Sequence, residues 1–199
     1  MIQNGDLGEL RYIASQRLNL GRIRSDVDAL WNFAPHDISI IQFLLDNPEP
    51  LDVFRFGMDY VQSGIEDVVF LYIKYQKKII SQIHVSWLDP KKIRRMTIVG
   101  SKRMVVYDDI REDKITIYDK GIDKMADLGI NMDFDLPGRF SFTYRSGDIV
   151  LPRIDMAEPL KLEIDHFLDC IEGKTICRSG PDHALNVTRI LELANKKIE

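Results

Sequence analysis

The sequence has little cysteine and no long apolar run. Two cysteines, Cys170 and Cys177, are too few for a disulfide framework, and neither a CxxC pair nor a companion histidine suggests zinc. No stretch approaches the roughly 20 apolar residues that span a bilayer. The N-terminus also lacks the basic and apolar regions of a signal peptide. These features favour a reducing, cytoplasmic setting and predict no membrane partner.

The composition is that of a globular protein, with 45% hydrophobic and 29% charged residues. The 199 residues suit one domain, and we take residues 1–199 as that domain. Three basic pairs, Lys91-Lys92, Arg94-Arg95 and Lys102-Arg103, could form a ridge for nucleic acid. The net charge of −4 and the lack of interleaved aromatic residues favour a solvated hairpin face instead. No nucleic-acid partner is therefore expected.

β-Branched and aromatic residues dominate from residue 52 onward, and turn-forming residues divide them into short strands. Because short connections require antiparallel pairing, we expect an α+β fold, with a large, open, mostly antiparallel sheet covered on one face by helices. Turns are expected at Asp89-Pro90 and Ser146-Gly147-Asp148, and an irregular loop at Gly121–Gly138. The expected strands are residues 9–20, 53–56, 67–75, 78–87, 94–99, 103–107, 114–118, 140–144 and 149–154.

Three helices are expected to cover the sheet. One lies within residues 28–46, and two others follow Pro159 and Pro181, each with a proline in the first turn. Both C-terminal helices carry an apolar stripe and are predicted to cover the core. The uncovered sheet face is a candidate for self-association. Alternation along a strand does not say which set of alternate side chains faces outward. The candidates for contact residues in self-association are Val69, Leu71, Ile73, Ile83 and Val85.

The helix within residues 28–46 carries the most informative polar side chains. His36 lies two residues past Ala34, about 200° around an ideal helix from the apolar stripe, so it should face a crevice. Asn32 stands four residues before it and shares its face if the helix begins upstream of Pro35. A histidine in a crevice can act as a general acid or base. The alternative is a histidine that caps a helix or bonds a carbonyl.

Several motifs occur in the order of one known family. Residues 30–38 (LWNFAPHDI) resemble a helix signature in the second domain of the glucose–fructose oxidoreductase, inositol dehydrogenase and MocA family. Residues 4–10 resemble the entry to that domain, and residues 86–94 resemble its SW-x-x-P-x-K-x-R hairpin. Gly100-Ser101, Tyr107-Asp108-Asp109 and Glu158-Pro159-Leu160 follow in order. The resemblance covers nearly the whole chain.

The resemblance implies a sugar-binding domain that works beside a Rossmann domain with NAD or NADP. His36 matches the family histidine that helps move the hydroxyl proton. The chain is most similar to members acting on nucleotide-linked amino sugars, such as UDP-N-acetylhexosamine or its uronate. In those, Asn32 and two arginines, Arg17 and Arg22, would contact substrate, although solvated strand-edge charges are an equal alternative for the arginines. The family also implies a homo-oligomer formed through the sheet face.

The dinucleotide-binding features of the family are missing from this sequence. There is no GxGxxG cluster and no Glu-Lys-Pro motif. We therefore expect no cofactor to bind this chain alone, which leaves its status as an enzyme open. Met1–Gly5 resembles the end of a helix, which favours a truncated parent or a split enzyme whose Rossmann half is a separate chain. The alternative is a non-catalytic binding or oligomerisation module.

No metal site is expected from the sequence. Three histidines outside the informative helix, His84, His166 and His183, are scattered over one strand and two helices without paired ligand spacing. His166 and Asp169 lie one turn apart, as ordinary neighbours on a helix surface do.

Overall fold

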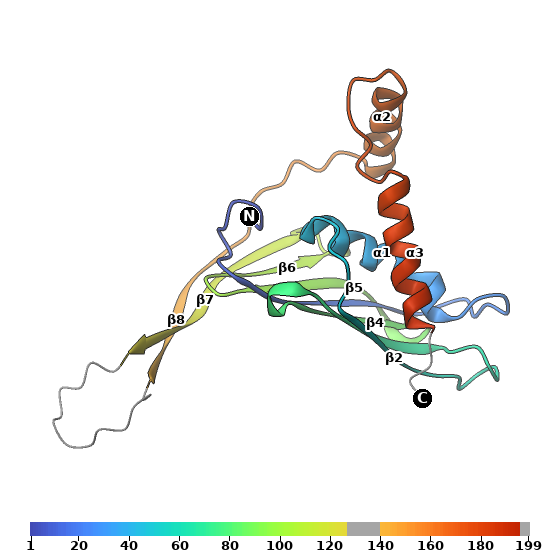
Figure 1. The fold of residues 1–199 in the computed structure, drawn as a ribbon, viewed down its shortest axis with the longest axis horizontal. Helices are drawn as coiled ribbons and strands as arrows, with labels where there is room; N and C mark the ends of the chain where they lie inside the picture. Colours follow the sequence, from blue (N-terminus) through green and yellow to red (C-terminus); the bar gives the residue numbers. More distant parts are fainter. Residues whose placement is uncertain (127–139, 196–199) are drawn as a thin grey trace.

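A computed structural model of the chain describes residues 1–126 and 140–195 and shows one sheet with helices on one side (Figure 1). No helix in these ranges has the length and apolarity needed to cross a membrane. The strands are β1 Leu10–Leu20, β2 Asp52–Met58, β3 Val68–Lys74, β4 Ile80–Ser86, β5 Leu88–Gly100, β6 Met104–Asp108, β7 Ile115–Ala126 and β8 Phe140–Val150. The helices are α1 Ala29–Leu45, α2 Pro159–Ile171 and α3 Pro181–Ala194, with a 3₁₀ turn at Gln76–Lys78.

The sheet has the order β2-β3-β4-β1-β5-β6-β7-β8 and is almost wholly antiparallel. The exception is the pair β1 and β4, which run parallel in the middle of the sheet. After β1 the chain passes through α1 and enters the edge strand β2. The hairpins β2-β3 and β3-β4 then bring β4 back beside β1. This confirms the predicted open, mostly antiparallel α+β fold.

Helix α1 begins upstream of Pro35 and carries the predicted apolar stripe. The Asp28 side chain caps it by accepting a hydrogen bond from the Trp31 backbone N–H at 2.9 Å. Pro35 is accommodated inside the helix, at the cost of one backbone hydrogen bond. Asn32 is therefore helical and lies one turn before His36, as the shared-face alternative required.

The core lies between α1 and one face of the sheet. α1 packs on β1, β3 and β4, and the inward parity of β3 and β4 is buried, as are Ile13 and Ser15 of β1. That parity comprises the residues named as candidates for self-association, each 0% exposed: Val69, Leu71, Ile73, Ile83 and Val85. The candidate choice was wrong, because these side chains form the core under α1. The opposite parity faces outward and includes Phe54, Phe56 and Tyr72.

The predicted turn at Asp89-Pro90 is instead part of β5. The register between β1 and β5 shifts between Leu18 and Leu20, so β5 bulges there. Pro90 lies in this bulge, where its missing N–H breaks no ladder hydrogen bond. A turn-forming dipeptide thus marks a bulge within one long strand.

A second predicted turn, Ser146-Gly147-Asp148, lies inside β8 and not between two strands. The register with β7 shifts between Tyr118 and Lys120, opposite this tripeptide. A Cβ at Gly147 would meet the Asp119 carboxylate at 2.5 Å, so glycine permits the close approach. The loop expected at Gly121–Gly138 is also corrected in part, because residues 121–126 belong to β7. The rest of that expected loop lies outside the described residues.

The two C-terminal helices differ in what they bury. α3 packs on α1 and β2 and buries Val187, Ile190 and Leu191, as predicted. α2 buries no residue, so the prediction that it covers the core was wrong. An extended segment leads from β8 to α2, which stands beyond α3 and away from the sheet (Figure 1). The apolar side chains of α2 are 49–67% exposed: Leu160, Leu162, Ile164, Phe167, Leu168 and Ile171.

Candidate functional site

A cleft of about 440 Å³ lies beside the middle turns of α1, over strands β1, β5 and β6. Its walls combine cationic, anionic and apolar side chains, which suits a polar ligand with an apolar face. The lining residues are Ser15, Arg17, Pro35, His36, Asp37, Ser39, Ile40, Arg94, Arg95, Met96, Tyr107 and Asp109. His36 and Arg17, two of the residues expected from the sequence, therefore meet in one cleft.

His36 keeps an accessible side chain at this cleft. Partial burial lowers its pKa below 6.5, the nearby charges of Arg17 and Arg94 lower it further, and Asp37 opposes them. The imidazole is therefore neutral at neutral pH, with one nitrogen able to accept a proton. This is the protonation state that a general base requires.

Asp37, the next residue of α1, points to β1 instead of the cleft mouth. Its Oδ2 accepts a hydrogen bond from Arg17 Nε at 2.6 Å, and its Oδ1 accepts one from Ser15 Oγ at 2.6 Å. The Arg17 and Asp37 side chains are 15% and 5% exposed. Arg17 thus lines the cleft with its guanidinium already bonded to Asp37. The pair joins α1 to β1 and holds the turn that carries His36.

The opposite wall is formed by Arg94 on β5 and by Tyr107 and Asp109 at the end of β6. Tyr107 donates a hydrogen bond to Asp109 Oδ1 at 2.9 Å, while Arg94 Nη1 lies 3.4 Å from Asp109 Oδ2. Burial and the bond to Asp109 raise the pKa of Tyr107 to about 12, so it remains a donor. Burial opposes ionisation of Asp109, but Tyr107, Arg94 and Lys114 outweigh it and lower the pKa of that carboxyl.

Sequence reasoning did not select this wall as part of the site. In the sequence, Arg94 is one half of a basic pair, and Tyr107-Asp108-Asp109 is only part of the family resemblance. The register of β5 and β6 brings them together, because Arg95 pairs with Asp108 and the Asp109 N–H donates to the Arg94 carbonyl. An antiparallel hairpin prediction with this register could have found the contact.

Asn32 and Arg22 do not line the cleft. Asn32 lies one turn upstream of His36 on α1, half-buried, and its side chain makes no hydrogen bond to any described residue. Arg22 follows the end of β1 and lines a separate hollow with residues 23–26. The structure therefore brings His36 and Arg17 together and leaves the other two expected residues outside.

The described residues do not fit the pyrophosphate of a dinucleotide. Such a group binds the free N–H groups of a helix N-terminus that follows a glycine-rich loop. Here an acidic residue precedes or opens each helix: Asp28 caps α1, Glu158 precedes α2, and Asp182 lies in the first turn of α3. Negative charge at these ends repels phosphate, so we derive no step of a reaction from a dinucleotide bound here.

Three potential metal ligands meet at the end of α2, a grouping that sequence reasoning missed. His166, Cys170 and Cys177 place one ligand atom each within 4.8 Å of the other two. The signal was the spacing of four residues between His166 and Cys170, which places both on one helix face. The position of Cys177 depends on how the chain turns after α2.

Comparison with known proteins agrees with this fold. The family model of the GFO/IDH/MocA C-terminal domain matches residues 1–106. A search of curated proteins finds no match. Among solved structures, the UDP-N-acetylglucosamine 3-dehydrogenase GnnA from Acidithiobacillus ferrooxidans is similar with a TM-score of 0.70 and 19% identity. That alignment covers 97% of this chain and 55% of GnnA.

Two further structures extend the comparison. The WlbA dehydrogenase from Bordetella pertussis, solved in complex with NADH and UDP-GlcNAcA, aligns with a TM-score of 0.65 and 15% identity, covering 99% of this chain and 56% of WlbA. An NAD-binding protein from Listeria innocua aligns with a TM-score of 0.67 and 16% identity, covering 96% of this chain and 57% of that one. The chain spans little more than half the length of these proteins.

Proposed function

Because the chain belongs to the GFO/IDH/MocA C-terminal domain family, we propose that it is the substrate-binding domain of an NAD(P)-dependent sugar dehydrogenase. The observation that carries the proposal is His36, with its lowered pKa, in a cleft of about 440 Å³ beside Arg94. In this function the neutral imidazole accepts the proton of the reacting sugar hydroxyl on its unprotonated nitrogen. Arg17 and Asp37 position the turn of α1 that carries it.

The other half of the chemistry lies outside the described residues. NAD or NADP would accept the hydride, held by a Rossmann domain that these residues do not contain. This chain alone is then expected to bind substrate without catalysing oxidation. The share of each solved relative that it covers, 55–57%, supports that division of roles.

A nucleotide-linked amino sugar or its uronate is the proposed substrate. Arg94 supports this choice, because its side chain is 42% exposed and its contact with Asp109 is long, at 3.4 Å. Its guanidinium can therefore turn to a phosphate or carboxylate and bind it with two hydrogen bonds. Asn32 and Arg22 lie outside the cleft, so they would contact only those parts of an extended substrate that project beyond it.

Calorimetric titration of the purified chain with UDP-N-acetylglucosamine and with its uronate tests the proposal. Arg94→Met should weaken binding about 10-fold or more, since a hydrogen bond to a charged group contributes about 1.5–3 kcal/mol. Arg153→Met is the matched control, because the Arg153 side chain is 94% exposed and away from the cleft. His36→Ala should also weaken binding, while NADH and NADPH should give no heat.

Two results would contradict the proposed function. The first is that neither sugar nucleotide binds, or that both bind equally well to Arg94→Met and Arg153→Met. The second is tight binding of NADH or NADPH to the chain alone, which would place the dinucleotide on residues that we judge unfit for it.

A second candidate function is assembly, which the outward sheet face favours. Phe56 and Met58 of β2 are 58% and 52% exposed, and Ile80 of β4 is 47% exposed. Phe56 and Tyr72 contact each other edge to face, with ring centroids 6.4 Å apart. An apolar surface of this kind marks a contact with another protein. We propose that it joins copies of this chain.

Light scattering during size-exclusion chromatography tests this second proposal. The wild-type chain should elute as an oligomer, and Phe56→Asp should reduce it to a monomer that keeps its circular dichroism spectrum. Leu185→Asp is the control, because Leu185 is 65% exposed on α3, away from the outward face. A monomeric wild type, or an oligomer that withstands Phe56→Asp, would refute assembly through this face.

A further inference from the structure

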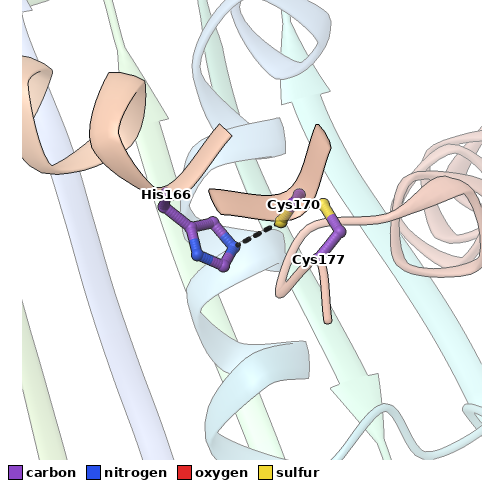
Figure 2. A group of neighbouring side chains, drawn as sticks. All are labelled: His166, Cys170 and Cys177. Atoms are coloured by element: carbon purple, nitrogen blue, oxygen red, sulfur yellow. Dashed lines mark hydrogen bonds between the residues drawn. The ribbon is translucent and has the colours of Figure 1, made fainter. Parts of the chain in front are cut away.

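A histidine and two cysteines converge where α2 ends (Figure 2). His166 and Cys170 lie one turn apart on α2, and Cys177 lies on the segment that leads to α3. Figure 2 shows the imidazole and both sulfur atoms turned toward one another. His166 Nε2 is 3.6 Å from Cys170 Sγ, and the three ligand atoms lie within 4.8 Å of one another. None of these residues takes part in the cleft.

We propose that His166, Cys170 and Cys177 form a binding site for a thiophilic divalent cation of the zinc type. Typical Zn–S and Zn–N bonds of about 2.3 and 2.0–2.1 Å place tetrahedral ligands about 3.6 Å apart for N and S. The two sulfur atoms would then be about 3.8 Å apart. The distance from His166 Nε2 to Cys170 Sγ already equals the first of these separations.

The hydrogen bonding of His166 leaves the required nitrogen unprotonated. The Arg178 backbone N–H donates to His166 Nε2 at 3.2 Å, so this nitrogen carries a lone pair. A cation held by the three side chains would bind this lone pair in place of the Arg178 N–H. Neutral imidazole is the form of histidine that binds metals.

A cation here would also supply what α2 lacks. α2 buries no residue, and a 13-residue helix without tertiary packing is marginal in water. Binding would tie its last turn to the segment before α3, so part of the binding free energy would stabilise that turn. Cys177 is exposed, which gives the ion a path of entry. Water or a group from a partner would complete the tetrahedron.

Cobalt, a spectroscopic stand-in for zinc, provides the direct test. The reduced chain of residues 1–199, titrated with Co²⁺, should develop a thiolate-to-cobalt charge-transfer band that saturates at one equivalent and disappears on addition of Zn²⁺. Cys170→Ser and His166→Ala should each weaken binding at least 10-fold. Asp169→Asn is the matched control, because Asp169 lies on the same turn and pairs with Lys174.

Three outcomes would overturn the metal site. One is the absence of a charge-transfer band in the reduced chain. Another is a band of equal strength in wild type, Cys170→Ser and His166→Ala, which would place the ion elsewhere. The third is a chain that binds no cation and instead loses two hydrogens by mass on mild oxidation, since that result would assign the cysteines to a disulfide. Circular dichroism of each variant confirms that α2 and α3 remain folded.

Discussion

Replacing Asp37 by alanine should destabilise the fold strongly, because it leaves the Arg17 guanidinium without a counter-charge under α1. In the native chain the Asp37 carboxylate bonds Arg17 Nε and Ser15 Oγ, each at 2.6 Å. The side chains of the ion pair are 5% and 15% exposed, so water cannot fully replace the lost partner. The predicted cost therefore comes mainly from the arginine that remains.

Breaking a buried ion pair by removing one partner costs about 3–5 kcal/mol. The residual exposure of Arg17 places the expected loss near the lower limit, at about 3 kcal/mol. With a urea dependence of about 3 kcal/mol per M for a chain of this size, the unfolding midpoint should fall by about 1 M. Trp87 is fully buried and reports unfolding by its fluorescence.

A double-mutant cycle separates the pair from a simple loss of packing. Arg17→Met combined with Asp37→Ala leaves no unpaired charge, so the double variant should be more stable than Asp37→Ala alone by about 1 kcal/mol or more. The reasoning fails if Asp37→Ala moves the midpoint by less than about 0.2 M of urea. It fails equally if the two substitutions are simply additive.

Two further predictions concern the pKa of His36 and the close contact between Gly100 of β5 and Leu7. Proton NMR titration should give His36 a pKa below 6.5, and Arg94→Met should raise it by removing a lowering charge. Since the unfolded chain binds this proton more readily, stability should fall as pH drops from about 6.5 through the folded pKa, and His36→Gln should reduce that slope in urea midpoints. Gly100→Ala should cost about 1–3 kcal/mol, because its Cβ would meet the Leu7 carbonyl oxygen at 2.1 Å. Gly180→Ala, whose nearest contact is 3.7 Å, should cost less, because it creates no clash and only replaces the N-cap glycine of α3.

The sequence was most informative where local rules decide the structure. The apolar spacing of α1 predicted that helix and the direction of His36, and the structure adds the cap at Asp28 that starts the helix upstream of Pro35. Runs of β-branched and aromatic residues between turns predicted most strands, yet β3 is apolar on both parities, with Leu71 beside Tyr72. Alternation could not say which parity the helix covers, because that depends on the side to which α1 crosses.

The rest of the cleft depends on contacts between distant parts of the chain. The Arg17–Asp37 pair needs the packing of α1 on β1, and the contact between Arg94 and Asp109 needs the register of β5 with β6. Each residue alone reads as an ordinary surface charge. The metal ligands at α2 are an intermediate case, because helical spacing joins two of them. The third depends on the turn at Gly173, which has a φ of 71°.

The two C-terminal helices show the limit of hydrophobic periodicity as a guide. α2 and α3 both begin with proline and both carry an apolar stripe, so the sequence predicts the same core-covering role for both. α3 buries its stripe against α1 and β2, while Phe167 and Ile171 of α2 remain 63% and 67% exposed. An apolar stripe indicates that one face of a helix packs against something, but it does not indicate which surface that is. For α2 that surface is not among the described residues, so a fixed position for this helix requires another constraint. The three ligands at its C-terminal end could supply that constraint.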